Sequence, residues 1–184
     1  LRKLYVKNEI DYLELHQLAF LNIIKSNNVE AINFLKKSIE KNPNYPNSYS
    51  DLGSLYLKGN RISEAKECFI KSLDLNKNLF SSLNNLGIIY KNQKEYKLAI
   101  KYFLNALRVN PKNYLVVYNL AQLFDALEDY NKAKDFYLNT LNLNSSYGNA
   151  IIAYYNLLLK TFEWRIIHKF EPKLKNFGVK FFQG

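Results

Sequence analysis

The sequence predicts an all-α fold in which helical hairpins stack into an α-solenoid. The first observation behind this prediction is that four residue columns recur at a spacing of 34. The columns are Leu18, Leu52, Leu86 and Leu120; Ala31, Ala65, Ala99 and Ala133; Ala19, Gly53, Gly87 and Ala121; and Asn42, Asn76, Asn110 and Asn144. A fixed period of this length is typical of solenoids, because one unit cannot bury its apolar face without a neighbour. The second observation is that only 6 Gly and 4 Pro occur in 184 residues.

Apolar or small residues at positions 4, 7, 8 and 11 of each repeat predict the first helix of a hairpin, called helix A. The repeats are residues 12–45, 46–79, 80–113 and 114–147. In the third repeat the four positions hold Leu83, Leu86, Gly87 and Tyr90. Asn22 stands where the first repeat is expected to have an aromatic ring. Because residues at this spacing share one face of an α-helix, we expect each helix A to bury that face.

A second periodic set, at positions 20, 24, 27 and 28, predicts the second helix of each hairpin, called helix B. In the third repeat these positions hold Ala99, Phe103, Ala106 and Leu107. Small residues at positions 8 and 20 allow the two helices to approach closely where they cross. The large side chain at position 24 is expected to fill the space beside the crossing.

Polar residues mark the expected ends of both helices. Turn-forming residues follow helix A in every repeat, for example Gly59-Asn60-Arg61 in the second repeat. Helix B is expected to end at the Asn column, because Asn tolerates the left-handed conformation at a helix C-terminus. Pro43 and Pro111 come directly after this column and cannot continue a helix.

The segments outside the repeats are expected to cover the two ends of the stack. Residues 1–11 are predicted to be an N-terminal helical cap or the remnant of a preceding repeat. Residues 148–184 are predicted to be a C-terminal capping helix and tail. Residues 150–159 form the most apolar stretch, but a bilayer span needs about 20 apolar residues. We therefore expect no membrane span.

These repeats resemble the tetratricopeptide repeat family. The degenerate pattern of that family is matched most fully by the third repeat, through Leu83, Leu86, Gly87, Tyr90, Ala99, Phe103, Ala106 and Pro111. Lys77 and Ser145 depart from the pattern, because the family has Pro at these two positions. The resemblance implies an α-solenoid that forms a right-handed superhelix. It also implies that the helices A line a concave groove used to hold other proteins.

The groove side of helix A carries side chains suited to a peptide backbone. Positions 2, 5, 6, 9, 12 and 13 are expected to point toward the concave side, away from the buried face. A carboxamide both donates and accepts hydrogen bonds, so a ladder of carboxamides can pair with an extended peptide. The predicted peptide-binding residues are Asn84, Asn85, Ile88, Asn119, Gln122, Asp51 and Gln17, with Ile88 as an apolar contact. The alternative is that these amides are ordinary hydrated surface.

One binding activity of the family is excluded in this register. Tetratricopeptide domains that clamp the acidic C-terminus of a heat-shock chaperone use Lys, Asn, Asn, Lys and Arg at set groove positions. The resemblance implies which positions of this chain correspond to them. The corresponding residues are His16, Phe20, Asp51, Ser81 and Asn85. The cationic clamp is therefore absent, and Asp51 is expected to repel a carboxylate.

The formal net charge of +10 raises the question of nucleic-acid binding. The basic residues concentrate in the third repeat, whereas the fourth repeat is acidic overall. Lys91, Lys94, Lys97 and Lys101 are expected to lie largely on a turn and on helix B, at the outer surface of the stack. Pentatricopeptide arrays, which read nucleic-acid bases, have a longer repeat period. We therefore predict no nucleic-acid partner.

No catalytic, metal or cofactor site is predicted. His16 and His168 are far apart in sequence and Cys68 is the single cysteine, so neither a zinc-ligand cluster nor a nucleophile with its base can be assembled. The glycines do not form a phosphate-binding loop. A chain with one cysteine does not depend on an internal disulfide, which indicates a reducing, cytoplasmic compartment.

We interpret the chain as a protein-interaction scaffold that binds an extended peptide or a partner protein and has no chemistry of its own. An alternative comes from Phe162, Glu163 and Trp164, which follow a helix A pattern. This segment resembles the junction in tetratricopeptide-containing glycosyltransferases of the O-GlcNAc transferase type. The resemblance implies a substrate-recognition arm whose catalytic domain lies outside this sequence. An ordinary capping helix explains the same residues.

A third interpretation is self-association as a homodimer. The C-terminal region has more apolar side chains than one cap is expected to bury, and an uncovered patch of that kind usually meets a partner. The residues concerned are Ile151, Ile152, Phe162, Trp164, Phe170, Phe177, Phe181 and Phe182.

Overall fold

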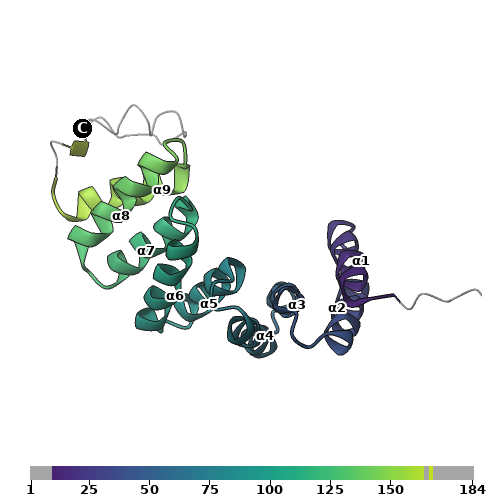
Figure 1. The fold of residues 1–184 in the computed structure, drawn as a ribbon. Coiled ribbons are helices and arrows are strands. Elements are labelled where there is room, and N and C mark those ends of the chain that lie inside the picture. The colour runs from purple at the N-terminus through teal and green to yellow at the C-terminus, as the bar shows by residue number, and fades with distance from the viewer. Residues whose placement is uncertain (1–9, 164–165, 168–184) are drawn as a thin grey trace, which may run out of the picture. The chain divides into compact units, whose positions relative to one another are not determined.

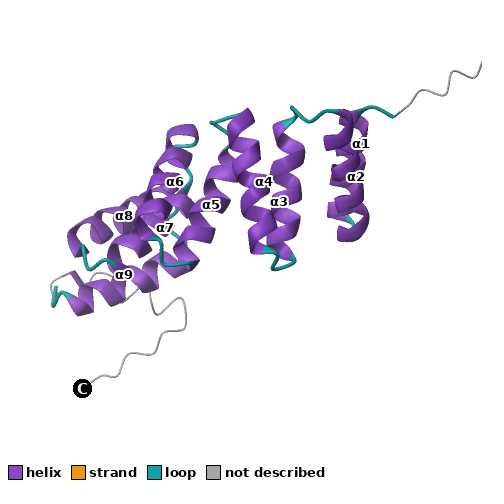
Figure 2. Ribbon diagram, turned by 90° about the horizontal axis from the view of Figure 1, so that it is seen from below, coloured by secondary structure: helices purple, strands orange, loops and turns teal. Residues whose placement is uncertain are grey.

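A computed structural model describes residues 10–163 and 166–167. Within these residues the chain forms nine α-helices and no strand, which confirms the all-α prediction. Figures 1 and 2 show these helices joined by short loops. The helices are α1 (Tyr12–Ile24), α2 (Asn28–Lys41), α3 (Pro46–Lys58), α4 (Ile62–Leu75), α5 (Phe80–Asn92), α6 (Tyr96–Val109), α7 (Tyr114–Ala126), α8 (Tyr130–Leu143) and α9 (Gly148–Lys160). Each odd-numbered helix begins at position 1 of the 34-residue period.

The chain forms two compact units, Leu1–Ile89 and Tyr90–Gly184, with the boundary inside α5. In the first unit α1 packs on α2, α2 on α3, and α3 on α4. In the second unit α6 packs on α7, α7 on α8, and α8 on α9. Sequential helices are therefore neighbours in both units, as stacked hairpins require.

The core of the hairpins α1–α2, α3–α4 and α7–α8 lies where helix A crosses helix B. The alanines at position 20 are fully buried in all four repeats, and so are the large side chains at position 24, namely Leu35, Phe69, Phe103 and Tyr137. Gly53 on α3 faces the Phe69 ring so closely that a Cβ atom there would lie 2.9 Å from Cε1. The small-residue columns therefore allow the close crossing that the sequence predicts.

Buried serine pairs join one hairpin to the next in the first unit. Ser38 Oγ lies 2.8 Å from Ser48 Oγ, and Ser72 Oγ lies 2.6 Å from Ser82 Oγ. All four hydroxyls belong to residues with no or almost no exposed surface.

In the second unit the same two repeat positions hold Ala106 with Val116 and Thr140 with Ala150, all buried. Thr140 Oγ1 donates to the Phe136 carbonyl of its own helix at 2.8 Å. The serine pair of the first unit is thus replaced by an apolar pair or by a hydroxyl that is bonded within its own helix.

The turn after helix A has the same backbone conformation in every repeat. Position 15 has a positive φ, between 55° and 62°, at Ser26, Asn60, Lys94, Glu128 and Phe162. In each turn the next residue donates its backbone N–H to a carbonyl in the last turn of helix A, for example Arg61 N to Tyr56 O at 2.8 Å. These bonds satisfy carbonyls that the helix end would otherwise leave without partners.

The Asn column ends helix B in a different way from the one predicted. Asn42, Asn76 and Asn144 have φ between −146° and −141°, which is extended and not left-handed. The side-chain oxygen of Asn42 accepts the backbone N–H of Asn44 at 3.0 Å, and Asn76 and Asn144 repeat this bond. The prediction of a left-handed Asn is wrong because these side chains form local turns with the backbone, a conformation that also suits a following Pro.

The helix α9 packs against α8 in the second unit. Tyr154, Leu157 and Leu158 of α9 are buried together with Tyr137 and Leu141 of α8. None of the helices among the described residues combines the length and the apolar character needed to cross a membrane.

Replacement of Gly53 by Ala tests the close helix crossing. The new Cβ would lie 2.9–3.1 Å from three ring carbons of the fully buried Phe69. Overpacking of this kind costs about 1–3 kcal/mol, against a gain of about 1 kcal/mol from removing a helical glycine. We expect Gly53→Ala to lower the free energy of unfolding by about 1 kcal/mol, the middle of the difference between these two figures, measured by urea unfolding followed by circular dichroism.

Gly59→Ala is the matched control for this substitution. Its nearest atoms would lie 3.5 Å from the new Cβ, and its φ is −83°, which any residue adopts. The free energy of unfolding is expected to stay unchanged or to rise. A Gly53→Ala variant as stable as the unsubstituted protein would contradict the assignment.

Candidate functional site

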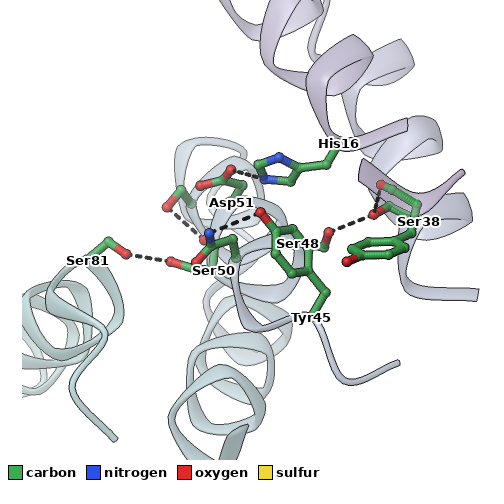
Figure 3. Close-up of polar contacts among 10 residues, drawn as sticks. His16, Ser38, Tyr45, Ser48, Ser50, Asp51 and Ser81 are labelled. Carbon is green, nitrogen blue, oxygen red and sulfur yellow. Dashed lines mark hydrogen bonds and ion pairs between the residues drawn. The ribbon is translucent and has the colours of Figure 1, made fainter. Parts of the chain in front are cut away.

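Polar residues on the helices A of the first unit bond to one another across neighbouring hairpins. His16 Nε2 on α1 lies 2.9 Å from Asp51 Oδ2 on α3. Figure 3 shows the two side chains pointing toward each other. The Tyr45 ring packs edge-on against the imidazole, with 5.2 Å between the ring centroids. Asp51, one of the predicted peptide-binding residues, therefore already has a partner.

Hydroxyl groups continue this network from α3 to α5. Ser50 Oγ lies 2.7 Å from Ser81 Oγ (Figure 3), and Ser54 Oγ donates to the Ser50 carbonyl at 3.0 Å. Asn85 Nδ2 donates to Ser54 Oγ at 3.3 Å. The Asn85 carbonyl oxygen has no hydrogen-bond partner among the described residues and can still accept a hydrogen bond.

In the second unit, Lys91 joins two predicted peptide-binding residues. It lies near the end of α5, and its Nζ donates to Asn119 Oδ1 at 2.6 Å and to Gln122 Oε1 at 3.0 Å, both on α7. Gln122 Nε2 donates in turn to the Tyr118 hydroxyl at 3.0 Å. We call these four residues the Lys91 cluster. The prediction that Lys91 lies at the outer surface is wrong, because position 12 of helix A points toward the helix A of the next repeat.

Burial changes the proton affinity of two groups in the Lys91 cluster. Lys91 is half-buried, and desolvation lowers the pKa of its ammonium group. Burial also raises the pKa of the Tyr118 hydroxyl, with a smaller contribution from the neighbouring Tyr147, while the hydrogen bond from Gln122 acts in the opposite direction. Tyr118 is therefore a neutral hydroxyl at neutral pH.

A pocket of about 380 Å³ adjoins the Lys91 cluster through Gln122. Its wall is formed by Gln122, Asp125, Ala126, Tyr137, Ala153, Asn156 and Lys160. Lys160 Nζ donates to Asp125 Oδ1 at 2.8 Å, so the two charges in the wall neutralise each other. Burial, and next the Asp125 carboxylate, raise the pKa of the Tyr137 hydroxyl, which therefore stays protonated. The pocket offers hydrogen-bonding groups beside two small alanine side chains.

The seven predicted peptide-binding residues fall in both units. Gln17, Asp51, Asn84, Asn85 and Ile88 belong to the first unit, and Asn119 and Gln122 belong to the second. The structure brings Asn119 and Gln122 together through Lys91. Asp51 is bonded to His16, and Asn85 is bonded to Ser54. Gln17 is exposed on α1, and Asn84 and Ile88 are half-buried on α5. Peptide binding by these residues stays a prediction.

Lys91 is the residue of this site that the sequence reasoning missed. A signal was present, because position 12 belongs to the set expected on the concave side. Lys91 was grouped with the lysines of the following turn and helix, which are exposed, and was therefore predicted to be exposed as well.

Comparison with known families identifies the repeats. Family models described as Tetratricopeptide repeat match residues 34–67, 80–113 and 116–147, which together make up more than half of the chain. The chain belongs to the tetratricopeptide repeat family. No curated protein sequence matches it.

Solved structures with the same fold include several tetratricopeptide proteins. PilF from Pseudomonas aeruginosa superimposes with a TM-score of 0.79 at 22% identity, over 92% of this chain and 78% of PilF. MamA from Desulfovibrio magneticus RS-1 gives a TM-score of 0.80 at 17% identity, over 90% of this chain and 93% of MamA. YrrB, described as a tetratricopeptide protein with an unusual peptide-binding site, gives 0.74 at 17% identity, over 84% of this chain and 80% of YrrB. At these identities the likeness shows a shared fold.

The C-terminal segment that resembles a glycosyltransferase junction has a local structural role. Glu163 accepts a hydrogen bond from Lys134 of α8, and its backbone N–H donates to Leu158 O at 3.0 Å. Trp164 lies outside the described residues. None of the matches above supports a glycosyltransferase, and that alternative stays a prediction.

The apolar C-terminal residues divide between the tetratricopeptide core and its surface. Ile151 is buried against α8 and is not available for a dimer contact, because it faces the core. Ile152 and Phe162 are 40% and 73% exposed. Trp164, Phe170, Phe177, Phe181 and Phe182 lie outside the described residues. Homodimer formation stays a prediction that light scattering over a concentration series can test.

Metal-ligating and nucleophilic residues are spread over the tetratricopeptide scaffold. Across residues 10–163 and 166–167, no three His, Cys, Asp or Glu side chains gather as metal ligands would. His168 lies outside these residues. Cys68 is partly buried on α4, and burial raises the pKa of its thiol to about 11, with Glu67 and Glu64 adding to the rise.

The Cys68 thiol is expected to react slowly with Ellman's reagent. A pKa of about 11 leaves less thiolate at pH 7.5 than an ordinary cysteine has, and the thiolate is the reacting form. We expect a rate at least tenfold below that of free cysteine at pH 7.5, rising with pH up to about 11. The rate for the folded protein is compared with the rate in denaturant. A folded-state rate equal to the denatured rate would contradict the burial argument.

Proposed function

We propose that this tetratricopeptide protein is a protein-interaction module that binds an extended peptide, or an extended segment of a partner protein, on the groove side of its helices A. The observation that carries the proposal is the pocket of about 380 Å³ in the second unit. Its wall contains Gln122, Asp125 and Ala126, which are groove positions 9, 12 and 13 of α7. A concave surface with a few directed polar groups is what peptide side chains require.

The amide side chains supply hydrogen bonds to the peptide backbone in this proposal. In the second unit the Asn119 carbonyl oxygen faces Lys91, so its N–H groups point elsewhere and can donate to a peptide carbonyl. In the first unit Asn85 uses an N–H on Ser54 and keeps its carbonyl oxygen for a peptide N–H. Each amide is held in place by an internal bond, which lowers the entropy lost on binding.

The fold comparison agrees with a binding role. YrrB, which shares the fold at 17% identity, is described as having a peptide-binding site. The likeness supports peptide binding only as an analogy, because function on a repeat scaffold depends on the side chains of its surface. The amides and the pocket of this chain are therefore the features to test.

Replacement of Asn119 by Ala, and separately of Asn85, tests the proposed role of the amides. The probe is a soluble synthetic library of random dodecapeptides passed over the immobilised chain, from which a retained peptide is labelled with fluorescein. A neutral hydrogen bond contributes about 0.5–1.5 kcal/mol, so we expect the dissociation constant to rise about threefold to tenfold for each variant. Fluorescence anisotropy measures it.

Asn131→Ala and Asn139→Ala are the matched controls, because both amides are exposed on α8. They are expected to leave the dissociation constant unchanged, and circular dichroism should give the same helicity for all four variants. Unaltered affinity in both Asn119→Ala and Asn85→Ala would remove the proposed role of the amides. Failure of the library to yield any retained peptide would remove the proposed function.

A further inference from the structure

Lys91 is a half-buried cation whose partners are neutral. Its Nζ donates to the carbonyl oxygens of Asn119 and Gln122, at 2.6 and 3.0 Å. Among residues 10–163 and 166–167, no carboxylate forms an ion pair with it. Burying an ammonium without a counter-charge is unfavourable, and two amide dipoles compensate it only in part. The site therefore holds a positive charge that a ligand can neutralise.

The neighbouring charges do not supply this neutralisation. Asp125 is the acidic residue in the wall of the adjoining pocket, and its Oδ1 accepts from Lys160 at 2.8 Å. Burial lowers the pKa of the Lys91 ammonium, and no carboxylate in the described part of the chain offsets this effect. The Lys91 cluster and the pocket together therefore carry a net positive charge.

The hydrogen-bonding capacity of the cluster also has room for an acceptor. An ammonium group has three N–H donors, and the two bonds of Lys91 leave one of them. The Asn119 N–H groups lie on the same side chain as the oxygen that Lys91 holds. One ligand group with two oxygens can accept from both residues.

We propose that Lys91 and Asn119 bind a carboxylate of the peptide that occupies the groove side of the second unit. The inference rests on the proposed function and specifies the chemistry of the ligand. A carboxylate fits better than a backbone carbonyl because it neutralises the ammonium and because charge-assisted hydrogen bonds are about twice as strong as neutral ones. Both an acidic side chain and a chain-terminal carboxylate carry this chemistry.

The site differs from the chaperone clamp that the sequence excludes. That clamp corresponds to His16, Phe20, Asp51, Ser81 and Asn85, all in the first unit. The proposed carboxylate site uses position 12 of one helix A and position 6 of the next, in the second unit. The proposed site has one cation, Lys91, which amides of this chain hold in place, whereas the clamp uses several cationic residues.

The first experiment uses the full chain without substitutions. A soluble library of random dodecapeptides, made once with a C-terminal acid and once with a C-terminal amide, is passed over the immobilised protein, and retained peptides are sequenced by mass spectrometry. We expect Asp and Glu to be enriched at least threefold over the input in both forms if a side chain supplies the carboxylate. If the chain terminus supplies it, retention occurs only with the free acid.

The second experiment measures the role of Lys91 with one retained peptide and its neutral isostere. The isostere replaces Glu by Gln, Asp by Asn, or the terminal acid by the amide. Isothermal titration calorimetry with the unsubstituted protein is expected to show about a tenfold loss of affinity for the isostere. Lys91→Gln is expected to bind both peptides equally, whereas Lys91→Arg keeps the preference. Lys101→Gln, an equal charge change at an exposed position on α6, is expected to behave like the unsubstituted protein.

The outcomes separate this inference from the proposed function. Retention of the amidated peptides without an enrichment of Asp or Glu would overturn the carboxylate site while peptide binding stands. A preference that persists in Lys91→Gln would place the carboxylate on another residue and overturn the assignment to Lys91. Retention of no peptide in either library would overturn the proposed function and this inference together. Should Lys91→Gln fail to fold, the library composition and the isostere comparison still test the inference on the unsubstituted protein.

Discussion

The close crossing of helix A and helix B is the contact on which the rest of the structure depends. At the crossings of α1 with α2, α3 with α4 and α7 with α8, an alanine at position 20 is fully buried, and one large side chain at position 24 packs beside it with almost no exposed surface. Burial of a side chain of that size contributes about 1.5–3 kcal/mol. A larger residue at position 8 or 20 would separate the helices and expose the side chain. The hairpin therefore keeps one helix face for its own core and leaves the opposite face of helix A for other contacts.

Stacking of the hairpins follows a second constraint, which concerns positions 27 and 3. In the first unit the two positions are serines that bond to each other in a fully buried contact, and in the second one pair of this kind is Ala106 and Val116. Both solutions avoid a buried polar group without a partner, which costs about 1–3 kcal/mol. The mixed pair of Thr140 and Ala150 avoids the same cost, because the Thr140 hydroxyl donates to the Phe136 carbonyl of its own helix at 2.8 Å. The contact between repeats can thus change its chemistry, provided that every buried hydroxyl keeps a partner.

The polar residues of helix A form bonds within the chain as well as offering them to a ligand. His16 with Asp51 and Lys91 with Asn119 each link a residue to a side chain of the next helix A. Such bonds fix the orientation of the side chains before a ligand arrives, which reduces the entropy lost on binding. They also set the charge that a ligand meets. One carboxylate oxygen of Asp51 is already bonded to His16, and an amide-bound Lys91 keeps its positive charge.

The sequence by itself determined the period, the helix positions and the core columns, because these depend on residues within one helix turn or one repeat. Ala99 and Phe103, for example, were predicted as core and are fully buried. Only the tertiary structure decided that the Asn column forms local side-chain turns, that Lys91 reaches Asn119, and that a pocket adjoins Gln122. These features depend on distances between side chains on different helices, and on competition among several polar partners. The sequence pattern gives neither these distances nor the outcome of this competition. Periodicity shows on which face of a helix a residue lies, but it does not show which side chain of another helix that residue contacts.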